Sequence, residues 1–144
     1  MIAFLYLGIK FLAYSFWMYM GFRSLRAEAT PSVLRSFALG FLRLFLGFFF
    51  GLLIYFGSGA LLSVFGYGTA ENILTYSLVY VPVRWIEWGI MSLFLVSPGG
   101  SRFFLGQGRA DRFWRIGGIG ISCLADIPLI ISLGGVIPTG RFLC

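Results

Sequence analysis

Long apolar stretches separated by short polar segments dominate the pattern of this chain. A helix that crosses a membrane needs about 20 mostly apolar residues. Four stretches of that length are present, at about residues 2–22, 36–58, 72–97 and 116–138. The pattern therefore predicts an all-α integral membrane protein, a four-transmembrane-helix bundle that forms a single domain over residues 1–144.

The connecting segments carry the signals of turns and helix ends. Pro31 follows Thr30 after the first stretch, and this combination favours a helix start with Thr30 as its cap. The segment GYGTAEN, residues 66–72, is typical of a short glycine turn. The first stretch is expected to remain as a membrane anchor, because the positive charge of a cleaved signal peptide precedes its apolar core, whereas Arg23 and Arg26 follow this one.

Arginines gather in two of the three connections. The first connection contains three and the third contains four, namely Arg23, Arg26 and Arg35, then Arg102, Arg109, Arg112 and Arg115. The segment between the second and third stretches contains no basic residue. Because basic loops stay in the cytoplasm, both chain termini are predicted to lie on the non-cytoplasmic side of an inner or plasma membrane.

The third connection mixes its arginines with aromatic side chains. SPGGSRFFLGQGRADRFWR suits a short cytoplasmic segment that lies on the membrane surface between the third and fourth helices. Its four arginines are then predicted to bind anionic phospholipid headgroups. The alternative is an ordinary basic loop with an aromatic belt.

Composition supports the membrane interpretation and excludes several function classes. With 59% hydrophobic and 11% charged residues, a water-soluble fold of this length could not cover its apolar surface. The net charge of +6 indicates lipid headgroups rather than nucleic acid, because the basic residues bracket the apolar stretches. Histidine is absent and the two cysteines are far apart, so no metal site and no cofactor is predicted.

Five ionisable residues interrupt the predicted spans: Lys10, Arg43, Arg84, Glu87 and Asp126. A charge left bare in hydrocarbon costs about 2.5–3.5 kcal/mol, so these side chains should face the bundle interior and pair. At about 1.5 Å of rise per residue, Arg84 lies level with Asp126, and Arg43 lies level with Glu87. These two ion pairs are the prediction, while Lys10 is expected to snorkel outward or to reach Tyr76 or Tyr80.

Three interpretations of this charge network remain open. Buried ions can serve only to fix helix register, they can form a site for a substrate, an ion or a lipid headgroup, or they can dock another membrane subunit. Pro82 lies near Arg84 and Pro128 lies near Asp126, which resembles the broken helices at membrane-centre binding sites. Prolines are also simply tolerated in membrane helices.

Small and aromatic residues predict how the helices pack. Gly40, Gly47 and Gly51 form a small-residue row that allows close helix contact, and Gly117, Gly118 and Gly120 are expected to do the same in the last span. Trp85 and Trp88 lie deep in the third span, where cation–π contacts with the arginines are expected.

Three function classes follow. The first is a non-catalytic subunit or assembly partner of a larger membrane complex, in contact with another membrane protein or with copies of itself. The second is a small oligomeric transporter or channel-like protein that uses the charges as its site. The third is a lipid-modifying membrane enzyme, although no catalytic motif is present and a carboxylate paired with arginine is a poor base.

Overall fold

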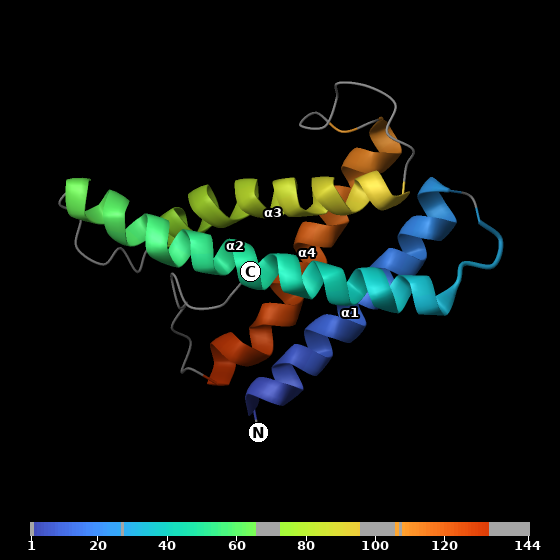
Figure 1. The fold of residues 1–144 in the computed structure, drawn as a ribbon, viewed down its shortest axis with the longest axis horizontal. Coiled ribbons are helices and arrows are strands. Elements are labelled where there is room, and N and C mark those ends of the chain that lie inside the picture. The colour runs from blue at the N-terminus through green and yellow to red at the C-terminus, as the bar shows by residue number, and fades with distance from the viewer. Residues whose placement is uncertain (1, 27, 66–72, 96–105, 107, 133–144) are drawn as a thin grey trace.

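The structure, a computed structural model, describes residues 2–26, 28–65, 73–95, 106 and 108–132, and it is all α over those residues. Four helices follow one another along the chain, as Figure 1 shows. They are α1 (Ile2–Leu25), α2 (Val33–Phe65), α3 (Ile73–Leu95) and α4 (Arg109–Ser132). The prediction of an all-α chain with four helices is confirmed.

The helices pack around α1, which contacts the other three. It packs extensively against α2 and α4, and α3 packs against α4 and less extensively against α2. In Figure 1, α1 ends on the same side of the bundle on which α2 and α4 begin. This alternation brings the arginine-rich ends of α1, α2 and α4 to one side of the molecule.

Each helix turns one face inward at a spacing of three to four residues, the period of an α-helix. The inward side chains of α1 are Tyr6, Lys10, Tyr14, Met18 and Phe22. Those of α4 are Asp111, Arg115, Ser122, Ala125 and Asp126. The inward stripe therefore contains most of the buried charges, and large apolar side chains lie on the outward faces.

Aromatic rings fill the centre of the bundle between the charges. Trp88 is fully buried, and its ring meets those of Tyr14 and Trp114 edge-on, at centroid distances of 5.8 and 5.2 Å. Trp114 and Trp17 exchange hydrogen bonds, because the indole N–H of each donates to the backbone carbonyl of the other. These bonds join α1 to α4 and satisfy both indole donors.

Glycines lie at close helix approaches, among them Gly40, Gly117 and Gly118. A Cβ added at Gly40 would lie 2.8 Å from the backbone nitrogen of Ser15, so α2 touches the backbone of α1 there. A Cβ at Gly118 would lie 2.5 Å from two ring carbons of Trp88, so the indole lies directly on α4. Gly47 and Gly51 are buried as well. The expectation for Gly120 is wrong, since it is exposed and an added Cβ meets no described atom within 4 Å.

The helix starts differ from the predicted ones. The cap of α2 is Ser32 rather than Thr30, because the Ser32 hydroxyl accepts the backbone N–H of Arg35 at 3.4 Å. Helix α4 begins at Arg109, before the predicted start at residue 116, so the last part of the expected surface segment, residues 109–115, is helical. Gly106 and Gly108, with φ of 81° and 150°, turn the chain just before it in a conformation that favours glycine.

Pro82 and Pro128 lie inside α3 and α4, which continue on both sides of them. Both helices are continuous at their prolines, which agrees with the interpretation that proline is tolerated there. Among the described residues, one segment is long and apolar enough to cross a membrane by length and composition, Val33–Leu53 of α2. Four membrane crossings remain a prediction.

Candidate functional site

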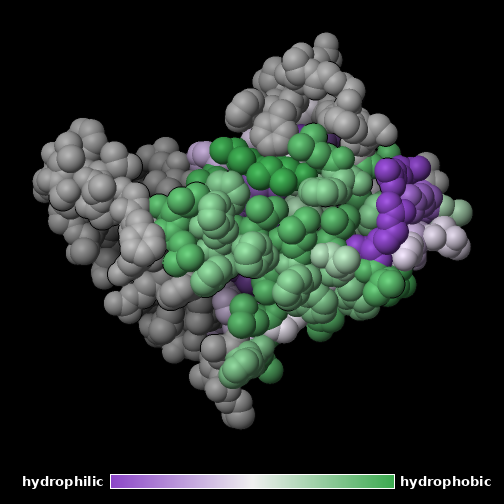
Figure 2. All heavy atoms as spheres, in the orientation of Figure 1, coloured by the Kyte–Doolittle hydropathy of each residue, from purple (hydrophilic) through white to green (hydrophobic). Residues whose placement is uncertain are grey.

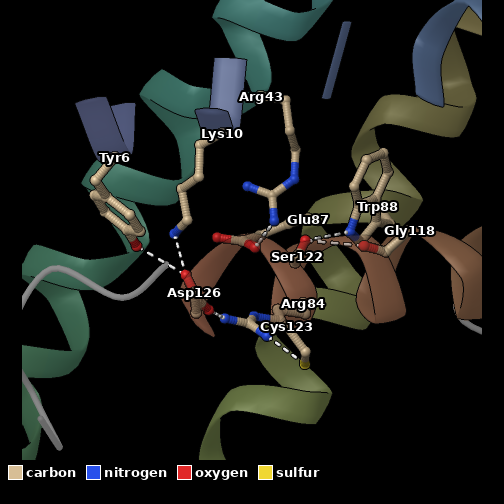
Figure 3. A network of polar contacts seen from close by, with 10 residues as sticks. All are labelled: Tyr6, Lys10, Arg43, Arg84, Glu87, Trp88, Gly118, Ser122, Cys123 and Asp126. Atoms are coloured by element: carbon tan, nitrogen blue, oxygen red, sulfur yellow. Dashed lines mark hydrogen bonds and ion pairs between the residues drawn. The ribbon is translucent and has the colours of Figure 1, made fainter. Parts of the chain in front are cut away.

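The carboxylate of Asp126 joins three helices. The Tyr6 hydroxyl donates to its Oδ1 at 2.7 Å, and the Lys10 ammonium lies 2.8 Å from the same oxygen (Figure 3). Arg84 of α3 donates to the other oxygen, Oδ2, and the Asp126 side chain is completely buried. Both carboxylate oxygens thus have partners, and α1, α3 and α4 meet at one side chain.

Arg84 reaches two positions of α4. Its Nη2 bonds Asp126, and its Nη1 donates to the Sγ of Cys123 at 2.8 Å. Cys123 and Asp126 are three residues apart, so both lie on the same side of the helix. The planar fork of the guanidinium suits two acceptors placed in this way.

Glu87 of α3 pairs with Arg43 of α2. Nη2 of Arg43 lies 2.5 Å from Oε2 of Glu87, and both side chains are fully buried. The guanidinium carbon of Arg43 also lies 4.9 Å from the ring centroid of Tyr14 and 5.0 Å from that of Trp88. The cation is therefore stabilised by one carboxylate and by two aromatic rings.

Trp88 and Ser122 tie the network to the packing of α3 on α4. The indole N–H of Trp88 donates to the Ser122 hydroxyl at 3.3 Å, and that hydroxyl donates to the carbonyl of Gly118 at 2.9 Å. Figure 3 shows this chain beside the Arg43–Glu87 pair. The hydrogen bond to Ser122 fixes the orientation of the Trp88 ring, which lies beside Arg43.

The two predicted ion pairs, Arg84 with Asp126 and Arg43 with Glu87, are both present. Lys10 belongs to the network, as predicted, but it does not snorkel outward, because its side chain is buried against Asp126. A lysine that reaches a carboxylate needs no snorkelling, and α1 packs closely enough on α4 for this contact. The side chains of Tyr76 and Tyr80 lie outside the described residues.

A second buried cluster, which the sequence analysis did not predict, lies near the start of α4. Arg115 pairs with Asp111 at 2.9 Å and donates to the Ser92 hydroxyl of α3 at 2.9 Å. Its guanidinium carbon lies 5.4 Å from the ring centroid of Trp85. The spacing of four residues between Asp111 and Arg115 is the signal that could have revealed the pair.

This cluster corrects one predicted headgroup ligand. Arg115 is fully buried and bound inside the protein, so it is not available to a headgroup at the surface. Arg109 and Arg112 are exposed, as the prediction required, and Arg102 lies outside the described residues. The cation–π contacts expected for the two deep tryptophans are both present. Trp88 contacts Arg43, and Trp85 contacts Arg115.

The chemistry available in the five-residue network is that of ion pairing. It contains three cations, Lys10, Arg43 and Arg84, and two carboxylates, Glu87 and Asp126, so cations exceed anions by one when all are ionised. Within the described part of the chain, no group of three or more metal-ligating side chains lies together. The site can hold helices in register, or it can hold a small polar ligand.

Comparisons of this chain with protein-family models, with curated proteins and with solved structures find no match.

Proposed function

We propose that this chain is an integral membrane protein of four transmembrane helices that acts, without catalysis, as a subunit or assembly partner of a larger membrane complex. The observation that supports membrane insertion is the reversed distribution of side chains. Lys10, Arg43, Arg84 and Glu87 are at most 1% exposed, whereas Phe41 is 63% exposed. A water-soluble domain does the opposite: it buries large apolar side chains such as Phe41 and exposes charged ones.

The outward faces of all four helices carry the same apolar character. Figure 2 shows a continuous hydrophobic face, with hydrophilic residues confined mainly to one edge. Exposed apolar side chains occur on each helix, among them Phe4, Leu12 and Phe16 of α1, Phe41, Phe45 and Phe49 of α2, Phe94 of α3, and Leu124 and Ile131 of α4. A surface of this kind is stable against lipid acyl chains or against another membrane protein.

The hydrophilic edge supports the proposed orientation. Arg23, Arg26 and Arg35 are exposed where α1 ends and α2 begins, and Arg109 and Arg112 are exposed where α4 begins. These helix ends lie on one side of the bundle in Figure 1. A cytoplasmic leaflet rich in anionic headgroups attracts such a side, which leaves both chain termini on the other.

The non-catalytic role is supported by the way the network uses its carboxylates. Asp126 accepts from a hydroxyl and two cations, and Glu87 accepts from a guanidinium. These contacts connect all four helices, so the network fixes their register. The large outward surface is then available for contact with a partner in the membrane.

Membrane insertion is tested by extraction. Vesicles that contain the tagged chain are washed with alkaline carbonate and then dissolved in a mild detergent. The chain is expected to stay in the membrane pellet through carbonate and to enter solution only with detergent. Release by carbonate would contradict membrane insertion.

The subunit role is tested by photo-crosslinking in intact membranes. A photoreactive amino acid replaces Phe45 on the outward face of α2, Leu124 on that of α4, or, as a control, buried Met18. A subunit gives an adduct of one defined protein mass from at least one outward position and none from Met18. Adducts with lipid alone at both outward positions would exclude the partner and leave membrane insertion intact.

The second candidate is a small transporter that uses the five-residue network as its site. The observation that favours it is the set of buried polar atoms in the Arg43–Glu87 pair that no described residue satisfies. Purified chain in sealed vesicles would then move a small polar solute. Equal solute flux in vesicles that contain the parent chain and in vesicles that contain the Glu87→Met variant would exclude this function.

A further inference from the structure

The Arg43–Glu87 pair has unsatisfied polar atoms on both of its members. Oε2 of Glu87 accepts from Arg43, whereas Oε1 of Glu87 has no hydrogen-bond partner in the described structure. Nε and Nη1 of Arg43 also lack one, and all three atoms are buried. In Figure 3, a single dashed line joins the two side chains, and the second carboxylate oxygen has none.

A third helix contributes another unsatisfied group. The Tyr14 ring of α1 lies next to the Arg43 guanidinium, at 4.9 Å from ring centroid to Cζ, and its buried hydroxyl bonds no described residue. Tyr6, two turns earlier on α1, differs because its hydroxyl donates to Asp126. Buried hydrogen-bonding groups are nearly always satisfied, because burial removes their bonds to solvent. Unsatisfied atoms on Arg43 and on the two side chains that contact it, Glu87 and Tyr14, therefore indicate a further hydrogen-bond partner.

The chemistry of these groups selects the partner. Arg43 offers only N–H donors, Glu87 offers only an acceptor when ionised, and the Tyr14 hydroxyl can act as either. An anion would be attracted by Arg43 and repelled by Glu87, and a cation would meet the opposite pair of forces. A small neutral molecule that both accepts and donates satisfies all three.

We infer that Arg43, Glu87 and Tyr14 hold a buried water molecule between α1, α2 and α3. The water accepts from one of the two unsatisfied Arg43 nitrogens, donates to Oε1 of Glu87 and bonds the hydroxyl of Tyr14, so it satisfies three of these four atoms. Three hydrogen bonds are the usual number for a buried water. The water adds a hydrogen-bonded link between Tyr14 of α1 and the Arg43–Glu87 pair, beside the cation–π contact that Tyr14 already makes with Arg43.

The first test compares two hydroxyl deletions, Tyr14→Phe and Tyr6→Phe, by thermal melting in the same detergent. If the Tyr14 hydroxyl bonds a water, the Tyr14→Phe variant melts at a lower temperature than the parent. The Tyr6→Phe variant is expected to do the same, because the Tyr6 hydroxyl is bonded to Asp126. If the Tyr14 hydroxyl is unbonded, its removal relieves a buried polar group and leaves the melting temperature unchanged or raises it. That second result would overturn the three-point site.

The second test detects the water directly. Chain labelled with ¹⁵N in arginine and tryptophan is placed in vesicles of deuterated lipid, and solid-state NMR follows magnetisation from water to each side-chain nitrogen. Arg43 is assigned by loss of its signal in Arg43→Lys, and exposed Arg109 is the wet control. The Trp88 indole, which bonds Ser122, is the dry control.

Early transfer to Arg43 and Arg109, with none to Trp88, is the expected result. No transfer to Arg43, or equal transfer to Trp88, would overturn the assignment. The inference concerns the interior of the bundle and goes beyond the proposed function. A chain released by carbonate could still hold this water, so the two proposals fail separately.

Discussion

The two buried ion clusters are built in different ways. Asp111 and Arg115 are four residues apart on α4, so one helix brings them together and Ser92 of α3 only adds to the pair. The five-residue network joins side chains more than 40 positions apart, as in Arg84 with Asp126 and Arg43 with Glu87. The first cluster supports a helix, and the second decides how the helices stand relative to one another.

The two halves of the network also differ from each other. Asp126 receives Tyr6, Lys10 and Arg84, and each of its oxygens has a partner. Glu87 receives Arg43 through one oxygen only. The contrast indicates that protein groups satisfy both carboxylate oxygens of Asp126, whereas Oε1 of Glu87 depends on something else. Substitutions should separate these regions by the size of their effects.

The largest effect is expected at Asp126. Asp126→Asn leaves Lys10 and Arg84 without their counter-ion, and breaking a buried pair in this way costs about 3–5 kcal/mol. Melting in detergent is measured for Asp126→Asn, for Arg84→Gln and for both together. The double variant should lose less than the two single losses combined, and simple additivity would show that the pair makes no energetic contribution.

Replacement of the whole Arg43–Glu87 pair should cost less than removal of one member. Glu87→Met alone buries an unpaired guanidinium and is expected to cost about 3 kcal/mol or more. The double variant Arg43→Met/Glu87→Met removes both charges at similar volume and should recover most of that loss. A double variant no more stable than Glu87→Met would show that the ions contribute more than mutual neutralisation.

An intermediate effect on stability is expected where Trp88 of α3 packs on Gly118 of α4. Gly118→Ala places a methyl group against the Trp88 ring, and overpacking of this kind costs about 1–3 kcal/mol. Gly120→Ala, two residues away and exposed, is the matched control and should be neutral or slightly stabilising. Equal melting temperatures for the two variants would contradict the close approach of α3 and α4.

A smaller effect is expected at Asp111. Asp111→Asn removes the counter-ion of Arg115, but Arg115 keeps its bond to Ser92 and its contact with Trp85. The expected loss of stability is about 1–2 kcal/mol, below that of Asp126→Asn. A loss as large as that of Asp126→Asn would remove the distinction between the local and the long-range cluster.

The smallest effect on stability is expected at the surface. Arg109→Gln/Arg112→Gln changes two exposed side chains, so the melting temperature in neutral lipid should be nearly that of the parent, within about 0.5 kcal/mol per site. Anionic phospholipid should raise the melting temperature of the parent more than that of the double variant. An equal rise in both would exclude these arginines as headgroup ligands.

The depth at which each charge was expected to lie in its helix identified the correct partners of Arg84 and Glu87, but it did not identify the carboxylate that Lys10 contacts. Arg84 and Glu87 were matched correctly because levels can be counted from the ends of apolar stretches. The pairing of Lys10 with Asp126 was not predicted, because the level of Lys10 alone gives neither the rotation of α1 nor the reach of its side chain. Arg115 was assigned to a surface segment because counting apolar residues ignores that a polar sequence can also form a helix.

The sequence by itself determined that this chain forms four helices, that five ionisable residues interrupt its apolar stretches, and which helix ends carry the arginines. Those properties follow from local composition and from the cost of leaving ions and backbone groups unsatisfied. Only the tertiary structure decided that Tyr6, Lys10 and Arg84 share one carboxylate, and that Arg43 lies beside Tyr14 and Trp88. Contacts of this kind depend on how each helix is rotated against its neighbours, which is set by the packing of all four together.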